Sequence, residues 1–256
     1  MKNLPTLVVL CAVASWSNSF AQYTDWVNYT NGQLVCVLAD NGNELWIGAC
    51  EGGLVKLDKA TEQMTFYNHA NSGLPHNAVW ALVVDGNNTW IGTENGLAKF
   101  DGSNWTTYDT NNSGLPGNII TALAIDNGNI WIGTNGDGLA MFDGSNWTTY
   151  DTSHFYLLNY TISCLLVDGD EIWFGTSTYS GEGVGLGMFD GADWAVYNAR
   201  NSGLPDDWVF AVAVDGSGNT WSGTWLGGLA AYREGGVIID PVVGHVRRGT
   251  VGRVRP

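Results

Sequence analysis

The chain has 256 residues, a net charge of −15 and only 14% charged residues. The basic side chains between residues 22 and 234 are few and scattered: Lys56, Lys59, Lys99, Arg200 and Arg233. A nucleic-acid partner requires a basic face, so this composition excludes one. No apolar run beyond residue 21 is long enough to span a bilayer, so we expect no membrane span there.

The first residues have the pattern of a secretory signal peptide, which we assign to residues 1–21. Lys2 precedes an apolar stretch at residues 7–14, and the small residues Ser19 and Ala21 stand where signal peptidase cleaves. We therefore expect a cleaved signal and a mature protein that is periplasmic or secreted.

A repeat dominates the rest of the chain. A complete copy reads Trp-x-Gly, a short loop, Gly-Leu, a hydrophobic-Asp pair and then an aromatic-x-x-Tyr, and the first and last copies depart from this pattern toward their ends. The Trp-x-Gly positions are Trp46, Trp90, Trp131, Trp173 and Trp221, which lie between 41 and 48 residues apart. A period of this length is typical of a solenoid or a propeller.

The third copy shows what one repeat should form. An apolar run at 119–125 predicts an inner strand, and the turn residues that follow predict a hairpin into 130–134. Two further strands are expected at 139–142 and 147–150, the last with alternating polar residues. Apolarity falls from the first strand to the fourth, as in the four-stranded blade of a β-propeller.

The two ends of the repeat region complement each other. Residues 26–29, Trp-Val-Asn-Tyr, read as an outer strand without a preceding blade, and the last repeat has no Trp-x-x-Tyr after Arg233. We predict an all-β protein, a propeller of five four-stranded blades over 22–234, whose ring is closed by the N-terminal outer strand. A fragment of a larger ring or array is the alternative.

Counted back from the turn aspartates, the inner strands carry a small residue at one position and a large aliphatic residue two positions earlier. Cys36 and Cys164 fall at the small position, so we interpret them as core fillers. A Cys36–Cys50 disulfide between adjacent strands remains an alternative in an exported protein. Residues 235–256 do not follow the repeat, and we predict a basic, disordered tail there.

The repeat resembles the two-component regulator propeller family, on the strength of Leu-Pro-Gly-Asn at 115–118, Ile-Trp-Ile-Gly-Thr at 130–134 and Gly-Leu-Ala-Met-Phe-Asp at 138–143. The resemblance covers about residues 24–233. It implies an exported ligand-binding sensor, often for glycans, with a signalling partner in the envelope. The residues given hold fewer blades than such sensors usually carry, and no kinase.

Function should lie where the repeats differ. Three loops keep Asn-Ser-Gly-Leu-Pro, whereas the fourth repeat replaces it at 153–160 and expands its second loop at 177–185. Loops between blades share one face with those between second and third strands. We predict a ligand-binding face for a glycan or a protein, because aromatic rings stack on sugars and carboxylates accept hydroxyl hydrogen bonds. Its residues are His154, Phe155, Tyr156, Tyr160, Tyr179, Glu182, Asp207, Trp208 and Trp225.

Other functions fit the sequence less well. We expect no catalytic residues, no cofactor and no metal site, since no Cys or His cluster has ligand spacing. A polysaccharide hydrolase or lyase on the same face, or a structural scaffold of the envelope, are the alternatives. We expect a monomer, and loop packing is the simpler interpretation of the aromatic residues.

Overall fold

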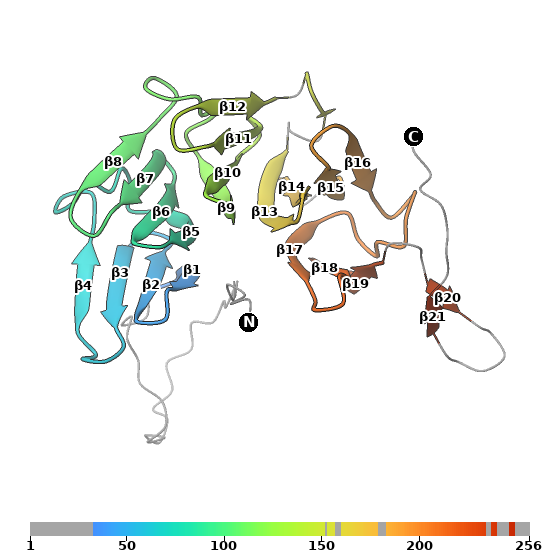
Figure 1. Cartoon of the computed structure of the whole chain (residues 1–256), viewed down its shortest axis with the longest axis horizontal. Helices are drawn as coiled ribbons and strands as arrows, with labels where there is room; N and C mark the ends of the chain where they lie inside the picture. Colours follow the sequence, from blue (N-terminus) through green and yellow to red (C-terminus); the bar gives the residue numbers. More distant parts are fainter. Residues whose placement is uncertain are drawn as a thin grey trace. The chain divides into compact units, whose positions relative to one another are not determined.

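The computed structural model describes residues 33–151, 153–156, 160–178, 183–233, 237–239 and 246–248. The chain forms two compact units, Met1–Leu123 and Ala124–Pro256, with the boundary inside one β-strand. Antiparallel sheets make up both units (Figure 1). Among the described residues, no helix is long and apolar enough to cross a membrane.

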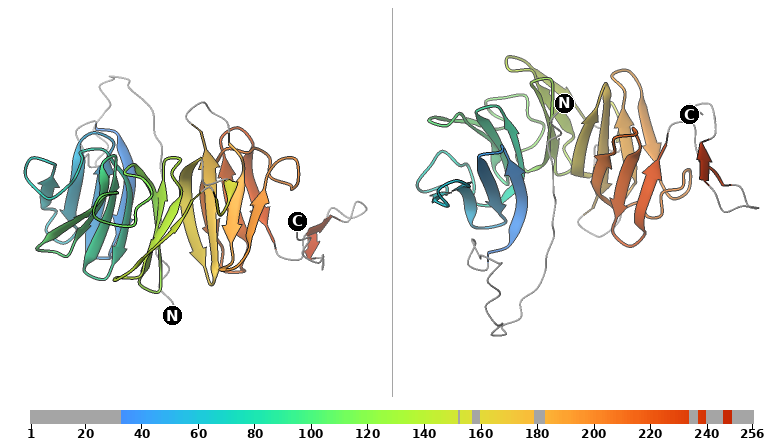
Figure 2. Two further views of the ribbon diagram at one scale, coloured as in Figure 1. Left: turned by 90° about the horizontal axis from the view of Figure 1, so that it is seen from above. Right: turned by 60° about the horizontal axis from the view of Figure 1, so that its bottom comes forward.

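Unit 1 holds two four-stranded sheets, and strands adjacent in sequence are adjacent in each sheet. The first sheet consists of β1 (Val35–Asp40), β2 (Glu44–Ala49), β3 (Gly53–Asp58) and β4 (Met64–Tyr67). The second consists of β5 (Val79–Asp85), β6 (Asn88–Thr93), β7 (Gly96–Phe100) and β8 (Trp105–Tyr108). The strands within each sheet are twisted, as Figure 2 shows.

The third sheet begins with the strand that contains the boundary. It consists of β9 (Ile120–Asp126), β10 (Asn129–Thr134), β11 (Leu139–Phe142) and β12 (Trp147–Tyr150). The fourth sheet consists of β13 (Thr161–Asp168), β14 (Glu171–Ser177), β15 (Leu186–Phe189) and β16 (Trp194–Tyr197). The fifth has three strands, β17 (Val209–Val214), β18 (Thr220–Thr224) and β19 (Gly228–Tyr232).

The predicted four-strand repeat is confirmed, and in the third copy each strand end lies within one residue of its expected place. The gradient of burial is different from the prediction. In the first four sheets the first strand is less buried than the second: β6 has five buried residues out of six, whereas β5 has three out of seven. The second strand is paired along both edges, whereas the first strand has one free edge, which explains the difference.

The glycine of Trp-x-Gly lets neighbouring sheets approach each other. A Cβ on Gly48 would lie 2.6 Å from Cγ1 of Val79, and one on Gly92 would lie 2.7 Å from Cγ2 of Ile120. In both cases the neighbour is a fully buried aliphatic residue at the start of the next sheet. Only glycine leaves room for this contact, so the repeat needs glycine at the position.

Aromatic rings complete the packing between successive sheets. In unit 1, Trp46 and Tyr67 of the first sheet pack on Phe100 and Trp105 of the second, with centroid distances from 4.7 to 6.1 Å within the group. Unit 2 repeats the arrangement with Trp131, Tyr150, Phe189 and Trp194, at 4.3 to 6.5 Å. Aromatic pairs add about 0.5–1.5 kcal/mol each beyond their buried area. We call such a group of four rings an aromatic quartet.

The first sheet corrects the prediction for its cysteines. The bulge of β1 lies between Val35 and Val37, so Val37 pairs with Gly48 just as Ala81 of the second sheet pairs with Gly92. The first hairpin turn is one residue longer than those of the second, third and fourth sheets, which displaces an alignment based on Asp40 by one position. Cys36 therefore falls on the bulge and forms a disulfide with Cys50, with 5.5 Å between their Cα atoms.

The predictions for the two ends of the chain have different outcomes. The signal peptide and the closing strand at 26–29 lie outside the described residues. Closure of a ring and a count of five complete blades stay predictions. Within the tail, where we expect no regular structure, β20 (Val237–Ile239) and β21 (Val246–Arg248) pair with each other. Val237, Ile238, Ile239 and Val246 are β-branched, which favours a strand over a coil.

The glycine contacts generate a test. A Cβ on Gly175 would lie 2.6 Å from the carbonyl oxygen of Val209 and 2.6 Å from Sγ of Cys164. We expect Gly175→Ala to lower the free energy of unfolding by about 1–3 kcal/mol, because the next sheet must move. Urea denaturation measures the change. Gly216→Ala is the control, since nothing lies within 4 Å of its Cβ position, and equal effects of the two substitutions would refute the packing argument.

The disulfide generates a second test. Reduction should lower the free energy of unfolding by about 3 kcal/mol, because Cys36 and Cys50 are 14 residues apart and their link restricts the unfolded chain. Thermal denaturation with and without dithiothreitol measures the loss. The double substitution Cys36→Ala and Cys50→Ala should abolish the response to the reductant, and a response that persists would show that the bond is not its source.

Candidate functional site

The structure describes seven of the nine predicted site residues. Tyr179 and Glu182 lie outside the described residues. The others fall into two groups in unit 2. One group is around Phe155, in the loop between the third and fourth sheets, and the other is around Trp208, at the start of the fifth. No ring contact between these two groups occurs among the described residues, so the structure does not assemble them into one cluster. Tyr160 is half-buried just before β13.

The Asn-Ser-Gly-Leu-Pro loops are held by side-chain amides. After β4, the Oδ1 atom of Asn71 accepts a hydrogen bond from the backbone N–H of Asn68 at 2.8 Å. Asn77 Oδ1 accepts another from the N–H of His69, also at 2.8 Å. The loops at 109–118 and 198–207 contain the same two contacts, at 2.6 to 2.9 Å. These bonds fix each loop before any ligand is present.

Two predicted site residues occupy these holding positions. Asp207 takes the place of Asn77, and its Oδ1 accepts the N–H of Ala199 at 2.6 Å. His154 takes the place of Asn71, with 3.3 Å between its Nδ1 atom and the backbone N of Asp151. Both side chains therefore have a structural task in their loops, which the sequence analysis did not foresee.

The carboxylate of Asp151 is the electrostatic centre of the fourth-repeat loop. It accepts hydrogen bonds from the Ser153 hydroxyl and the Ser153 backbone N–H, and it lies 3.0 Å from Nδ1 of His154. The hydroxyl of Ser153 is the largest of the influences that lower the pKa of Asp151 to about 2. This loop is thus ordered by its own polar groups.

The aromatic residues of the same loop cover the fourth sheet. Phe155 stacks on Trp194 with 5.2 Å between centroids and meets Phe174 edge-on at 6.4 Å. Tyr156, which is 54% exposed, lies 5.3 Å from Phe155. Phe155 is therefore engaged in loop packing, and only Tyr156 presents a ring to the solvent.

The second group is a compact set of three rings, Trp208, Phe210 and Trp225, which we call the aromatic cluster. Their centroids lie 4.9 to 5.4 Å apart, with tilted planes. Phe210 is the bulged residue of β17, and a bulge redirects side chains near functional sites. Trp225 is 58% exposed. A tilted set of rings with one open member can stack on an apolar surface of a ligand.

The carboxylate of Asp206 links the two loops that carry the aromatic cluster. Its Oδ1 accepts the N–H of Trp208 at 2.7 Å, and its Oδ2 accepts the N–H of Leu226 at 3.2 Å. The N–H of Trp225 bonds to the carbonyl oxygen of Trp208 at 3.0 Å. One carboxylate and one backbone bond therefore join the two loops that carry the rings, so the cluster is organised in advance of binding.

The charge around the aromatic cluster is negative. Its two loops, 206–210 and 225–228, contain Asp206 and Asp207 but no lysine or arginine. An anionic ligand would find no counter-charge within these loops. Among the described residues, no group of three histidine, cysteine, aspartate or glutamate side chains could hold a metal ion.

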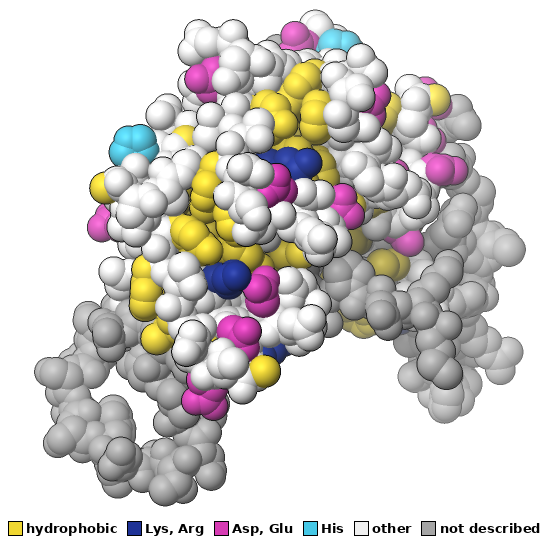
Figure 3. All heavy atoms as spheres, turned by 60° about the vertical axis from the view of Figure 1, so that its left-hand side comes forward, with side chains coloured by type: hydrophobic (Ala, Val, Ile, Leu, Met, Phe, Trp, Pro, Cys, Tyr) yellow, Lys and Arg dark blue, Asp and Glu magenta, His cyan; other side chains and the backbone are white. Residues whose placement is uncertain are grey.

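Two lysines of unit 1, Lys56 and Lys99, pack over tryptophan rings of their own sheets. Lys56 Nζ lies 5.8 Å from the ring centre of Trp46 and 2.9 Å from Oε1 of Glu44, and this hydrogen bond raises the pKa of Lys56. Lys99 lies over Trp90 at 5.4 Å. On the face in Figure 3, the basic side chains appear singly beside hydrophobic and acidic ones. Cations of this kind do not form the continuous basic face that nucleic acid requires.

Two of the repeats match a family model. The model described as "Two component regulator propeller" matches residues 73–95 and 114–136, each of which contains a Gly-Leu-Pro loop, an inner strand and the following Trp-x-Gly strand. These segments are two component regulator propeller repeats. The resemblance inferred from the sequence is thereby confirmed, and the four-stranded antiparallel sheets are consistent with a propeller. Curated proteins gave no match.

Solved structures share the fold. The extracellular domain of BT4673 from B. thetaiotaomicron, assigned to a hybrid two component system, is 23% identical with a TM-score of 0.62, over 78% of this chain and 27% of that one. For BT3049 of the same organism, also a hybrid two component system, the identity is 23%, the TM-score 0.55 and the coverage 78% and 34%. PorZ, a surface component of the type-IX secretion system of Porphyromonas gingivalis, is 17% identical with a TM-score of 0.60, over 90% and 37%. This chain thus spans 27% to 37% of those structures.

The sequence analysis missed two members of the site. Neither Phe210 nor Asp206 was among the predicted site residues. A signal was present, because the fifth repeat alone places aromatic residues at all three positions 208, 210 and 225, where the second has Ala78, Trp80 and Glu94. The bulge at Phe210 and the two hydrogen bonds accepted by Asp206 could not be derived from the spacing of residues along the chain.

The loop around Asp151 yields a prediction. Because the pKa of Asp151 is lowered from 3.8 to about 2, the stability this group contributes is present above pH 4 and is lost as the pH falls toward 2. Ser153→Ala should raise the pKa of Asp151 toward 3.8, as measured by carboxyl-carbon NMR titration. Ser145→Ala is the control, because only the backbone of Ser145 reaches Asp143. An Asp151 that already titrates near 3.8 in the unaltered chain would contradict the described loop.

Proposed function

We propose that this chain is an exported, non-enzymatic ligand-binding module of the sensor type, which binds a glycan at the aromatic cluster of its loop face. The observation that carries the proposal is the organised set of Trp208, Phe210 and Trp225 with one exposed ring. Indole rings stack on the apolar faces of sugar rings, and preorganisation lowers the cost of binding. The two component relatives of the same fold support a sensor role.

The charge pattern restricts the ligand. Carboxylates at Asp206 and Asp207 border the rings, and their loops carry no basic residue. Such a site favours neutral or amino sugars and disfavours uronic or sialic acids, which need a positive partner. A protein partner with an apolar side chain would be the other ligand for the same rings.

Export is supported by the disulfide. A bond between Cys36 and Cys50 persists in oxidising compartments such as the periplasm or the extracellular space. This agrees with the signal peptide that we assign to residues 1–21. The hydrogen bonds of Asp206 and Asp207 support the non-enzymatic part of the proposal. Both carboxylates accept backbone N–H groups, as carboxylates that build loops do.

A five-bladed ring is part of this proposal. The face of the fifth sheet that would meet a further sheet is open, since Leu229 is 67% exposed while its counterpart Leu186 is buried. The Cβ position of Gly223 has no neighbour closer than 3.7 Å, unlike the crowded glycines of the earlier sheets.

The experiment is a thermal-shift and calorimetric screen of neutral, amino and acidic oligosaccharides on the purified mature chain. We expect a neutral or amino oligosaccharide to bind, and Trp225→Ala to weaken its affinity about tenfold or more, which corresponds to about 1.4 kcal/mol.

Two exposed rings outside the cluster are matched controls. Phe66→Ala, at 55% exposure in unit 1, and Tyr156→Ala, at 54%, should leave the affinity unchanged. Loss of binding with Tyr156→Ala alone would move the site to the fourth-repeat loop. A well-folded chain that binds no sugar from the panel would overturn the glycan assignment and favour a protein partner.

A further inference from the structure

We propose that the loops of the second sheet carry a second binding site, built from Trp80, His76 and Glu94, which binds an organic ammonium group such as that of an amino sugar. The site lies in unit 1, whereas the aromatic cluster of the proposed function lies in unit 2. The inference therefore goes beyond the proposed function and does not depend on it.

This site stands on the same backbone frame as the aromatic cluster. In the fifth sheet, the N–H of Trp225 bonds to the carbonyl oxygen of Trp208 at 3.0 Å. In the second sheet, the N–H of Glu94 makes the same bond to Ala78 at 3.3 Å. The bulge of β5 holds Trp80, just as the bulge of β17 holds the third ring of the cluster. The three side chains of the second sheet therefore start from equivalent places.

The side chains on this frame differ in a way that matters for a ligand. In the fifth sheet, two indole rings pack on Phe210, at 4.9 and 5.4 Å between centroids. In the second sheet, the same two places hold Ala78 and Glu94, so no ring covers Trp80 among the described residues. Trp80 is half-buried. Its indole is thus a partly open platform beside a carboxylate.

His76 holds the loop and thereby fixes its own tautomer. Its Nδ1 atom accepts the backbone N–H of Ala78 at 3.1 Å, as the carboxylate of Asp206 accepts that of Trp208. A ring nitrogen that accepts a hydrogen bond carries no proton, so in the neutral imidazole the proton is on Nε2. The described residues supply no acceptor for this Nε2–H group, and His76 is exposed. A ligand can therefore accept it.

Glu94 supplies the negative charge of the site. Its Oε2 atom lies 3.8 Å from Nδ1 of His76, which is too far for a hydrogen bond. The segments 71–80 and 93–97 contain no lysine or arginine, and within the described part of the chain no such residue pairs with Glu94. A carboxylate without a basic partner attracts a cation.

An organic ammonium group suits these three side chains. Tryptophan is the aromatic residue that attracts a cation most strongly over its ring, within about 6 Å of the centroid. The carboxylate of Glu94 accepts the hydrogen bonds of the ammonium group. A hydroxyl on the next carbon atom of the ligand accepts the Nε2–H of His76. An amino sugar carries an ammonium group and a hydroxyl side by side, so it can satisfy all three side chains.

Room for a longer ligand lies next to the site. Pro75 and Asn95, the sequence neighbours of His76 and Glu94, line a cavity of about 280 Å³ to which Asp109 also contributes. Small-molecule sites begin at about 300 Å³. The cavity therefore has room for the second sugar of a short amino oligosaccharide, and its only charged lining residue is acidic.

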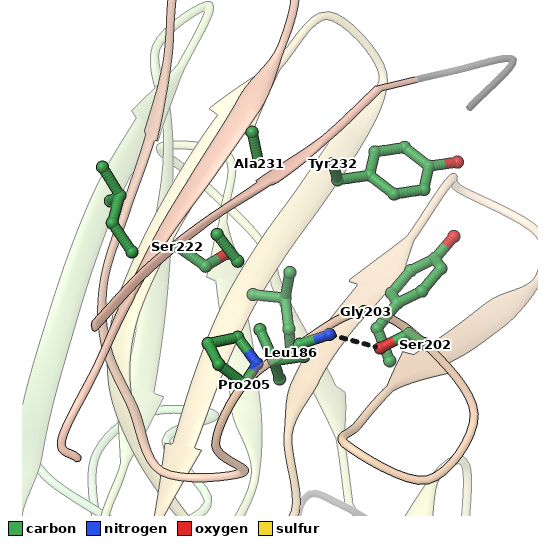
Figure 4. A pocket seen from close by; sticks show the side chains of 11 residues that line it. Leu186, Ser202, Gly203, Pro205, Ser222, Ala231 and Tyr232 are labelled. Carbon is green, nitrogen blue, oxygen red and sulfur yellow. Dashed lines mark hydrogen bonds between the residues drawn. The ribbon is translucent and has the colours of Figure 1, made fainter. Parts of the chain in front are cut away.

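The loop that leads to His76 is held by its own hydrogen bonds. The N–H of Leu74 donates to Oγ of Ser72 at 3.2 Å. Figure 4 shows the same bond in unit 2, where Leu204 donates to Ser202 at the wall of a groove of about 250 Å³. No charged residue lines that groove. The shared loop therefore does not by itself create a site for a cation, and the side chains of the second sheet do.

Two sugars that differ in charge test the proposal. The chain for the test is the full mature chain with Trp225→Ala, which removes the proposed site in unit 2. Its affinity for the dimers of glucosamine and of N-acetylglucosamine is measured by calorimetry. We expect the glucosamine dimer to bind, and the acetylated dimer, which carries no ammonium group, to bind at least tenfold more weakly. Equal affinity for the two dimers, or no binding of the glucosamine dimer, would overturn the proposal.

A pair of glutamate variants locates the charge. In the same background, Glu94→Gln keeps the size of the side chain and should weaken the glucosamine dimer about tenfold or more. Glu62→Gln is the matched control, because Glu62 is an exposed glutamate of the same unit and its loss changes the net charge equally. It should leave the affinity unchanged. Equal losses in both variants would reveal a general attraction by the acidic chain and refute the site.

Two further variants separate binding from folding. His76→Asn can still accept the N–H of Ala78, so it should melt like its parent, while loss of the Nε2–H donor should weaken the dimer by a factor of about 2–10. Trp80→Leu removes the platform and should weaken the dimer by a factor of about 2–30. A folded Trp80→Leu chain with unchanged affinity would exclude the indole from the site and overturn the proposal.

Discussion

The structure depends on close contact between successive sheets. This contact requires a glycine in each Trp-x-Gly, where the next sheet comes nearest, and aromatic rings farther out, where the sheets are wider apart. Gly48, Gly92 and Gly175 leave space for the next sheet, and the quartets of rings fill the space farther out. Neither element works alone, because a side chain at the glycine would push the sheets apart and separate the rings. This explains why Trp-x-Gly and Trp-x-x-Tyr recur together through a chain whose loops vary.

This rigid packing is what allows loops to carry function. Loop bonds from Asn71, Asn77 and their counterparts hold each connection in place whether or not a ligand is bound. His154 and Asp207 show how a residue that stands out in the sequence can still serve the scaffold. The aromatic cluster differs, because Trp225 is held by its neighbours and yet leaves its ring in the solvent.

Negative charge restricts the choice of ligand under the proposed function. A net charge of −15, with no lysine or arginine in the two loops of the aromatic cluster, disfavours anionic partners. The proposed site would therefore depend on apolar stacking by its rings. The disulfide at the first bulge secures the hairpin of β1 and β2 at an end of the repeat region, where no earlier described sheet covers it.

The sequence by itself determined the repeat, the family resemblance, the order of strands within a copy and the strand bounds of the third copy to within one residue, because period and turn residues are local properties. It placed Cys36 wrongly, because the longer first hairpin turn shifts the register and only the pairing of Val37 with Gly48 reveals the shift. Tertiary structure alone decided the disulfide, the grouping of Trp208 with Phe210 and Trp225, and the structural tasks of His154 and Asp207. These depend on distances between residues that are far apart in the repeat pattern, and spacing along the chain does not contain them.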